Sequence, residues 1–274
     1  MASIKNFLAG NLSRKTVLTR LIPLVLVVIF GSLFITGMFF PTEFDWRVMV
    51  LSALFVSKDN PDGYIYFSVA VVVIAVSLIP MLGYLHRRLN KICMGTTRTG
   101  SVFLIISIIG FLLMGIFAIY PPLGEILFNE DRMHEYMSFL GLVGLVLAYF
   151  FYGFSLLKDR KVGKRQINQP ALIIGTIIMW IVFLGLVLSQ GVLEIIEAVY
   201  EPDWPYVGID WIDGTFLPKP PLVLSFALWE WLLVIGVFVY MVLLLFMIPE
   251  DVEAIPKKRK KQKEKAEIVK ETSQ

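Results

Sequence analysis

The sequence predicts an all-α protein, a polytopic helical bundle with six transmembrane helices. Of its 274 residues, 57% are hydrophobic and 17% are charged, and the mean hydropathy is +0.74, well outside the range of soluble domains. The chain also contains six apolar runs of roughly 20 residues, each long enough to cross a hydrocarbon core about 30 Å thick. These runs occupy residues 21–40, 64–85, 101–121, 136–157, 170–192 and 222–248.

The first run, residues 21–40, is interpreted as a retained span and not as a cleaved secretory signal. Lys5, Arg14, Lys15 and Arg20 precede it, as basic residues precede a signal peptide. The run is longer than the apolar region of a typical signal, however, and no A-x-A cleavage site follows it.

Lysine and arginine lie mostly on one side of the predicted topology. If the loops alternate across six spans, 21 of the 25 Lys and Arg residues fall within 1–20, 86–100, 158–169 and 249–274. Cytoplasmic loops carry such an excess, so we predict that both termini are cytoplasmic. Residues 1–20 would then form a cytoplasmic N-terminal segment, and residues 21–248 the transmembrane domain.

Residues 249–274 are predicted to form a disordered, basic cytoplasmic tail, because the run KKRKKQKEKAE cannot bury a core. The tail either determines topology or binds anionic lipids of the inner leaflet, at about 1 kcal/mol per basic residue near the surface. Because it is held at a membrane, we do not expect it to bind nucleic acid.

Three loops are predicted on the outer side, at residues 41–63, 122–135 and 193–221. In the first, residues 46–56 are too apolar for a solvated loop and too short to cross, so they are expected to lie at the interface or fold back into the bundle mouth. The following KDNPDG is a turn signal. The third loop alternates acids with aromatic residues and is predicted to rest on the outer leaflet as a lid.

Small residues in the third and fourth runs indicate close helix contacts. Gly110 with Gly115, and Gly141 with Gly144 and Ser138, are the candidates.

The sixth run contains a carboxylate, Glu230, in the stretch LSFALWEWLLVIG. It lies about nine residues into the span, or roughly 13 Å from its outer end. An acid at that depth is usually paired, protonated or turned toward a wet cavity. Two interpretations remain open: a glutamate that ties two helices together, or a polar contact for a lipid headgroup, ion or proton.

His134 and Glu135 open the fourth run, at the predicted outer mouth. A histidine there suits a metal ligand or general base, while a helix-capping or interfacial histidine is the alternative. Ser138, one turn further along, is the best candidate for a nucleophile, although small-residue packing explains it equally well. The other histidine, His86, is interpreted as part of a charged flank.

Glu194, Glu197 and Glu201 share one helical face as the fifth run ends. They form either a solvated acidic face or a weak candidate site for a divalent cation. The sequence lacks zinc, Walker, nucleophile-elbow, haem and flavin motifs, so no cofactor is expected.

Three stretches resemble the DRAM/FRAG/SFK family of six-span membrane proteins, or a related prokaryotic six-span domain. They are LSALFVSKDNPDGYIYF after the first span, IIGFLLMGIFA followed by MHEYMSF, and WEWLLVIGVFVYMVLLLFMIPED in the sixth span. The resemblance implies a protein that acts on or organises membrane lipids. By matched position, it implies that Glu230, His134 and Glu135 contact the ligand. Tyr240, in the same sixth-span stretch, is a further candidate for ligand binding.

The favoured hypothesis is therefore a non-catalytic protein that binds or organises membrane lipids in an outward-facing polar cleft between spans four and six. The alternative is an intramembrane lipid hydrolase or acyltransferase that uses a His/acid pair, with His134 as general base. Ion or proton transport is a weaker possibility, because one intramembrane acid is few for a coupled pathway.

Overall fold

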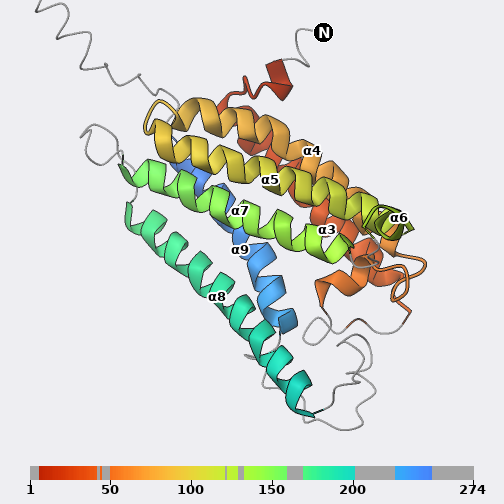
Figure 1. Cartoon of the computed structure of the whole chain (residues 1–274). Coiled ribbons are helices and arrows are strands. Elements are labelled where there is room, and N and C mark those ends of the chain that lie inside the picture. Colours follow the sequence, from red (N-terminus) through yellow and green to blue (C-terminus); the bar gives the residue numbers. More distant parts are fainter. Residues whose placement is uncertain are drawn as a thin grey trace, which may run out of the picture.

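The structure, a computed structural model, describes residues 6–41, 44, 50–120, 122–128, 133–158, 169–200 and 226–248. Within these residues, all regular secondary structure is helical (Figure 1). The elements are α2 (Arg14–Thr16), η1 (Val17–Leu21), α3 (Ile22–Met38), η2 (Leu51–Phe55), α4 (Tyr64–Leu89), α5 (Met94–Ile119), α6 (Pro122–Phe128), α7 (Met133–Lys158), α8 (Gln169–Tyr200) and α9 (Phe226–Met247). The segment η1 is a π-helix and η2 is a 3-10 helix.

Six helical stretches of the described chain are long and apolar enough to cross a membrane, which confirms this part of the prediction. They are Arg14–Met38, Tyr64–Leu89, Met94–Ile119, Met133–Lys158, Pro170–Ser189 and Phe226–Met247. The chain is therefore an all-α, multi-pass membrane protein.

Several helices extend beyond the predicted spans. The helix α4 continues to Leu89 and α5 begins at Met94, so a short turn at residues 90–93 replaces most of the loop expected at 86–100. Likewise, α8 continues to Tyr200, past the expected start of the third outer loop. Charged side chains can keep their ends in water while their stems stay on the helix, so a helix need not stop where the apolar run does.

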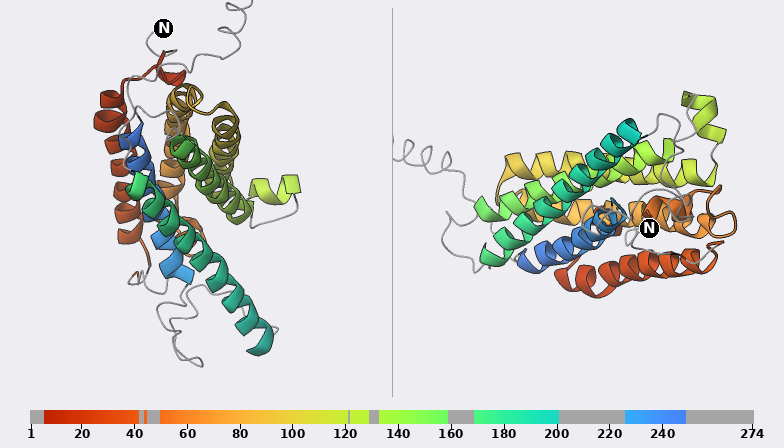
Figure 2. Two further views of the ribbon diagram at one scale, coloured as in Figure 1. Left: turned by 90° about the vertical axis from the view of Figure 1, so that its left-hand side faces the viewer. Right: turned by 90° about the horizontal axis from the view of Figure 1, so that it is seen from below.

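The bundle is built from α3, α4, α5, α7 and α9. The helix α8 packs mainly against α9 and diverges from α7 toward its own C-terminal end (Figures 1 and 2). We call the end of the bundle at which α3 ends and α4 begins the η2 end, because η2 lies there.

The N-terminal segment docks on α4, which the sequence did not predict. Gly10 has a left-handed backbone, with φ of 66°, and a Cβ there would lie 2.2 Å from the backbone N of Tyr84. A Cβ on Gly83 would in turn lie 2.6 Å from the carbonyl oxygen of Ala9. The guanidinium of Arg14 donates to the carbonyl of Phe246 in α9. The segment is thus packed against the bundle at Ala9, Gly10 and Arg14.

The helices α5 and α7 pack with their backbones in contact. A Cβ on Gly110 would lie 2.5 Å from the backbone N of Gly141, and one on Gly144 would lie 2.9 Å from the backbone N of Ser107. Gly115 instead faces α4, where a Cβ would lie 2.8 Å from the carbonyl of Ser68. The predicted packing role of these glycines is confirmed.

A substitution at Gly110 tests this contact. The Gly110→Ala variant should lose about 1–3 kcal/mol of unfolding free energy, because backbone atoms cannot move aside as a flexible side chain can. The matched control is Gly31→Ala in α3, where nothing lies within 4 Å and alanine should be neutral or stabilising by up to about 1 kcal/mol. Thermal denaturation in nanodiscs measures both, and equal melting temperatures would contradict the close packing.

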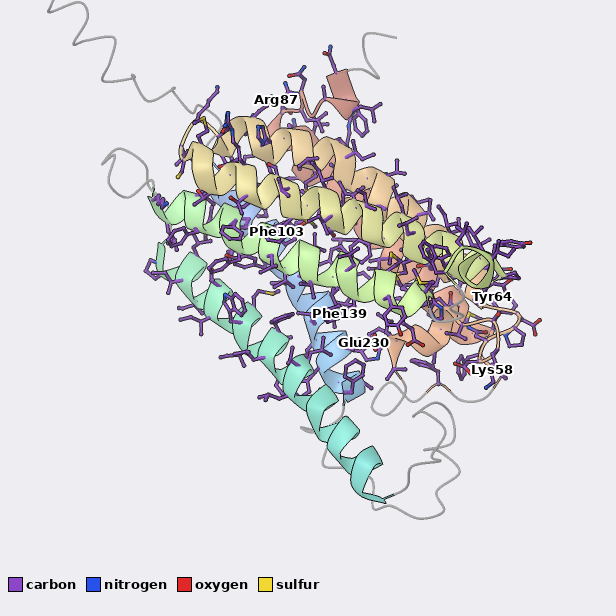
Figure 3. All side chains as sticks on the ribbon, viewed as in Figure 1. Lys58, Tyr64, Arg87, Phe103, Phe139 and Glu230 are labelled. Carbon is purple, nitrogen blue, oxygen red and sulfur yellow. The ribbon has the colours of Figure 1, made fainter. Side chains whose placement is uncertain are left out.

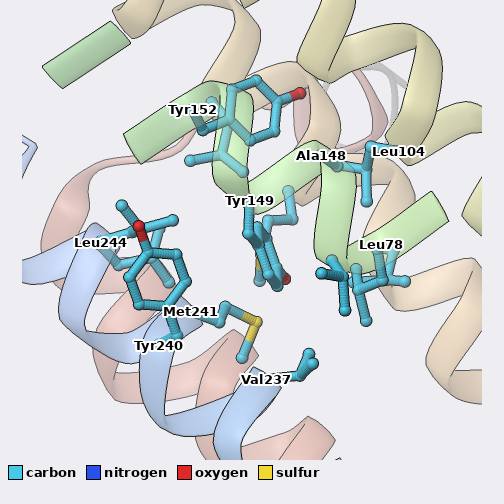
Figure 4. Packing of buried hydrophobic residues seen from close by; sticks show 14 of the residues in the cluster. Leu78, Leu104, Ala148, Tyr149, Tyr152, Val237, Tyr240, Met241 and Leu244 are labelled. Carbon is cyan, nitrogen blue, oxygen red and sulfur yellow. The ribbon is translucent and has the colours of Figure 1, made fainter. Parts of the chain in front are cut away.

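Bulky side chains pack against one another in the interior of the bundle (Figure 4). Tyr149 and Tyr152 of α7 and Tyr240 of α9 are almost completely buried, together with Leu104 and Met241. Buried tyrosine hydroxyls usually find a hydrogen-bond partner. Tyr149 donates to Met81 Sδ of α4 at 3.8 Å, and the bonds of Tyr152 and Tyr240 to neighbouring helices are described below.

Candidate functional site

Glu230 lies near the start of α9, and its carboxylate reaches the segment between α3 and α4 (Figure 3). The backbone N–H of Leu51 donates a hydrogen bond to Glu230 Oε2 at 2.5 Å. Leu51 is the first residue of η2 and follows the extended Val50, so its N–H has no acceptor within its own helix. The carboxylate supplies that acceptor, and this hydrogen bond explains why an acidic residue occurs in an otherwise apolar helix.

The segment η2 closes one end of the bundle with apolar side chains. Those at most 6% exposed are Leu51, Ala53, Leu54 and Phe55. They pack with residues of α3, α4 and α5 in one hydrophobic cluster. Of the two alternatives for the first outer loop, the described part, residues 50–56, therefore folds back into the bundle.

Asn60 fixes the other side of this segment. Its Nδ2 donates to the carbonyls of Thr36 and Leu54, each at 3.1 Å, and its Oδ1 accepts from the N–H of Gly63 at 3.1 Å. The side chain is fully buried, so these bonds replace water entirely. Asn60 thus joins the end of α3, the end of η2 and the start of α4.

A cavity of about 80 Å³ runs along the axis of the bundle, between α3, α4, α5, α7, α9 and η2. On α4 its lining extends from Phe67 to Leu78, on α7 from Ser138 to Tyr149, and on α9 from Glu230 to Met241. Each interval is eleven residues, so the cavity is roughly 16 Å long at 1.5 Å per residue. Glu230, Leu51 and Phe55 stand at its η2 end.

The described lining of this axial cavity is apolar apart from Glu230, Ser138 and the phenol of Tyr149. This differs from the polar cleft expected between spans four and six. The reason is that the carboxylate finds its partner in a backbone N–H of η2, and large apolar side chains of five helices occupy the surrounding space.

His134 and Glu135 lie beside the cavity and are not part of its lining. His134 Nε2 is 3.9 Å from Glu135 Oε1, and its ring packs edge-on against Phe55 with centroids 6.0 Å apart. Glu135 is near enough to act electrostatically on Glu230. The structure therefore brings these three residues to the η2 end, but it separates His134 from the cavity that Ser138 lines.

Tyr240 lies apart from this group. It is ten residues beyond Glu230, or roughly 15 Å along α9. Its hydroxyl is 2.6 Å from Thr176 Oγ1, which joins α9 to α8, and a Cβ on Gly153 of α7 would lie 2.3 Å from it. In this position, Tyr240 ties helices together.

The candidate cation ligands cannot be placed. The side chains of Glu194 and Glu197, and all of Glu201, lie outside the described residues. Among the residues whose side chains are described, no group of three or more His, Cys, Asp and Glu is arranged to hold a metal ion.

The sequence analysis missed a polar network at the opposite end of the bundle. His86 is not merely part of a charged flank: its Nδ1 is 2.7 Å from Ser101 Oγ, which is 3.1 Å from the hydroxyl of Tyr152. Ser155 Oγ lies 2.7 Å from Thr96 Oγ1. These bonds join α4, α5 and α7. In the sequence, polar residues one helical turn apart in α5 indicated that this helix has a polar face.

No family model, curated protein or solved structure matches the chain. The fold and the site therefore define its class: an integral membrane protein whose described residues include six candidate spanning helices and an apolar axial cavity, with the carboxylate of Glu230 in the cavity lining at the η2 end.

Proposed function

We propose that this protein binds and organises membrane lipids, without catalysing a reaction on them, by taking a lipid chain into the axial cavity. The observation that carries the proposal is the cavity itself, which is elongated, apolar and bounded at one end by Glu230. The resemblance to the DRAM/FRAG/SFK family, whose members act on or organise membrane lipids, favours the same function.

The energetics of an internal void support an occupant. At about 24 cal/mol per Å³, an unfilled cavity of 80 Å³ costs about 2 kcal/mol of stability. Water does not fill such a space favourably, since water needs several polar partners. A bilayer offers alkyl chains at high concentration. Because these chains are already in an apolar medium, the gain on entering the cavity is the restored van der Waals contact that removes the cost of the void, and not a transfer from water.

Blocking the cavity tests this function. Val234 lines the cavity, whereas Val239 of the same helix is 64% exposed. In Val234→Phe the ring should occupy the cavity. Retained lipid measured by native mass spectrometry should then fall at least about tenfold, because the void whose filling is worth about 2 kcal/mol is no longer there. Val239→Phe is the matched control and should retain lipid as the unmodified protein does. Equal retention in both variants, with unchanged melting temperatures, would contradict lipid binding in the cavity.

We also propose that both termini are cytoplasmic and that the η2 end faces outward, because 21 of the 25 Lys and Arg residues are on the side of the termini. The basic tail, residues 249–274, would then contact anionic lipids of the inner leaflet.

The only cysteine, Cys93, offers a test of this orientation. It lies in the turn between α4 and α5, at the end opposite η2. Burial alone would raise the pKa of its thiol, but hydrogen bonding with Thr96 and the charge of Lys158 lower the pKa below its usual value, which favours reaction with a maleimide. We expect an impermeant maleimide to label Cys93 only after the membrane of intact spheroplasts is permeabilised.

The complementary variant places a cysteine at the exposed Asp62, near the η2 end, in a Cys93→Ser background. Asp62→Cys should react without permeabilisation. The reverse pattern of labelling would place the termini outside.

A further inference from the structure

The dimensions of the axial cavity restrict the shape of its occupant. Its 80 Å³ are spread over roughly 16 Å of helix, so its cross-section is narrow. For comparison, a compact cavity of about 150 Å³ lined by Leu, Ile and Phe holds one benzene ring. A long and narrow space admits an unbranched alkyl chain more readily than a ring or a pair of chains.

The polar end of the cavity restricts the chemistry of the occupant's head. Glu230 Oε2 accepts from Leu51, and its second carboxylate oxygen is an acceptor as well. Glu135 lies near enough to act electrostatically on Glu230 and is itself 3.9 Å from His134 Nε2, while no Lys or Arg occurs among the described lining residues. An anionic head would meet repulsion without a compensating partner, whereas a hydroxyl or ammonium group would donate a hydrogen bond to Glu230.

Resting on the proposed function, we infer that the axial cavity binds a single unbranched alkyl chain whose head is a neutral or cationic hydrogen-bond donor, a hydroxyl or an amine, held by Glu230. Ser138, which lines the same cavity, offers a second hydroxyl for this head. Long-chain alcohols, monoacylglycerols and sphingoid bases share this chemistry, while fatty-acid anions and phosphate-terminated chains do not.

Three photoreactive probes test the inference. They carry the same diazirine-bearing dodecyl chain and end in a hydroxyl, an amine or a carboxylate. Each is added at equal mole fraction to the protein in phosphatidylcholine nanodiscs, and labelling of Val237 and Met241 in the inner part of the lining is quantified by peptide mass spectrometry. The hydroxyl and amine probes should label these residues at least about tenfold more than the carboxylate probe, the factor that a hydrogen bond to a charged group provides.

Two variants sharpen the result. Glu230→Gln keeps an acceptor for Leu51 but removes the ionisable carboxyl group. The carboxylate probe should then label the cavity more strongly, and the ratio of labelling by the hydroxyl or amine probe to labelling by the carboxylate probe should fall toward one. Val234→Phe should abolish labelling of the cavity by all three probes. Native mass spectrometry of retained lipids then distinguishes an alcohol or monoacylglycerol from a sphingoid base.

The outcomes separate the two proposals. If no probe labels the cavity lining, the proposed lipid binding itself fails. If all three probes label it equally in the unmodified protein, lipid binding stands and the preference for a donor head is overturned. If Glu230→Gln does not fold, the comparison of the three probes in the unmodified protein still tests the preference for a donor head.

Discussion

In an Asn60→Ala variant, the free energy of unfolding should fall by about 3 kcal/mol or more. The amide of Asn60 makes hydrogen bonds with the carbonyls of Thr36 and Leu54 and with the N–H of Gly63, and it is fully buried. Alanine removes all three bonds, and each buried polar group left without a partner costs about 1–3 kcal/mol. Thermal and denaturant unfolding in nanodiscs would measure the loss.

The control for this substitution is Asn11→Ala. Asn11 is exposed, and its side chain bonds only to the side chain of Asn6 in the described structure, at 3.2 Å. Its loss should change stability by less than about 0.5 kcal/mol, as is usual for surface substitutions. An Asn60→Ala variant as stable as Asn11→Ala would show that Asn60 does not fix the end of η2.

The second large effect is expected at Glu230. Glu230→Ala leaves the N–H of Leu51 without its acceptor at the closed end of the cavity, at a cost of about 1–3 kcal/mol. The segment η2 should then open more often, and hydrogen exchange of the amides from Leu51 to Phe55 should accelerate roughly tenfold or more. Mass spectrometry of peptic peptides measures this rate directly.

Glu230→Gln is the matched variant, because its amide oxygen can accept the same hydrogen bond from Leu51. Exchange in η2 should therefore remain close to that of the unmodified protein. If alanine and glutamine accelerate exchange equally, the charge of Glu230, and not its role as acceptor, holds η2 in place.

The number and class of the helices could be predicted because length and hydropathy report directly on the bilayer. Six apolar runs gave six spanning helices, and the glycines at 110, 115, 141 and 144 were assigned correctly to helix contacts. The helix ends were not predictable in the same way. Polar residues around Arg87 and Thr97 continue α4 and α5 into the aqueous boundary, where hydropathy no longer distinguishes a helix from a loop.

The site was predictable only in part. Glu230 could be singled out because a carboxylate in an apolar run is rare. Its partner could not, since Leu51 is 179 positions away and contributes a backbone N–H, which every residue except proline carries. The axial cavity also has no signature in the sequence, because its volume depends on how side chains from five helices and η2 fit together.

The sequence analysis grouped Tyr240 with Glu230 in one candidate site, but membership of one helical motif does not show that two residues lie close together. Both residues belong to the same stretch of α9, yet ten residues of helix separate them, and Tyr240 pairs with Thr176 of α8. The network of His86, Ser101 and Tyr152 joins three helices, so the spacing of polar residues in α5 could indicate a polar face but could not identify its partners on α4 and α7.

The most direct test of a lipid chain in the axial cavity is a cryo-electron microscopy map of the protein in nanodiscs made from its native membrane lipids. The account predicts an elongated density along the axis of the bundle, beginning beside Glu230 and ending near Met241, that is absent from a map of Val234→Phe. A map of the unmodified protein in which the lining side chains close the space, with no density between Glu230 and Met241, would contradict it.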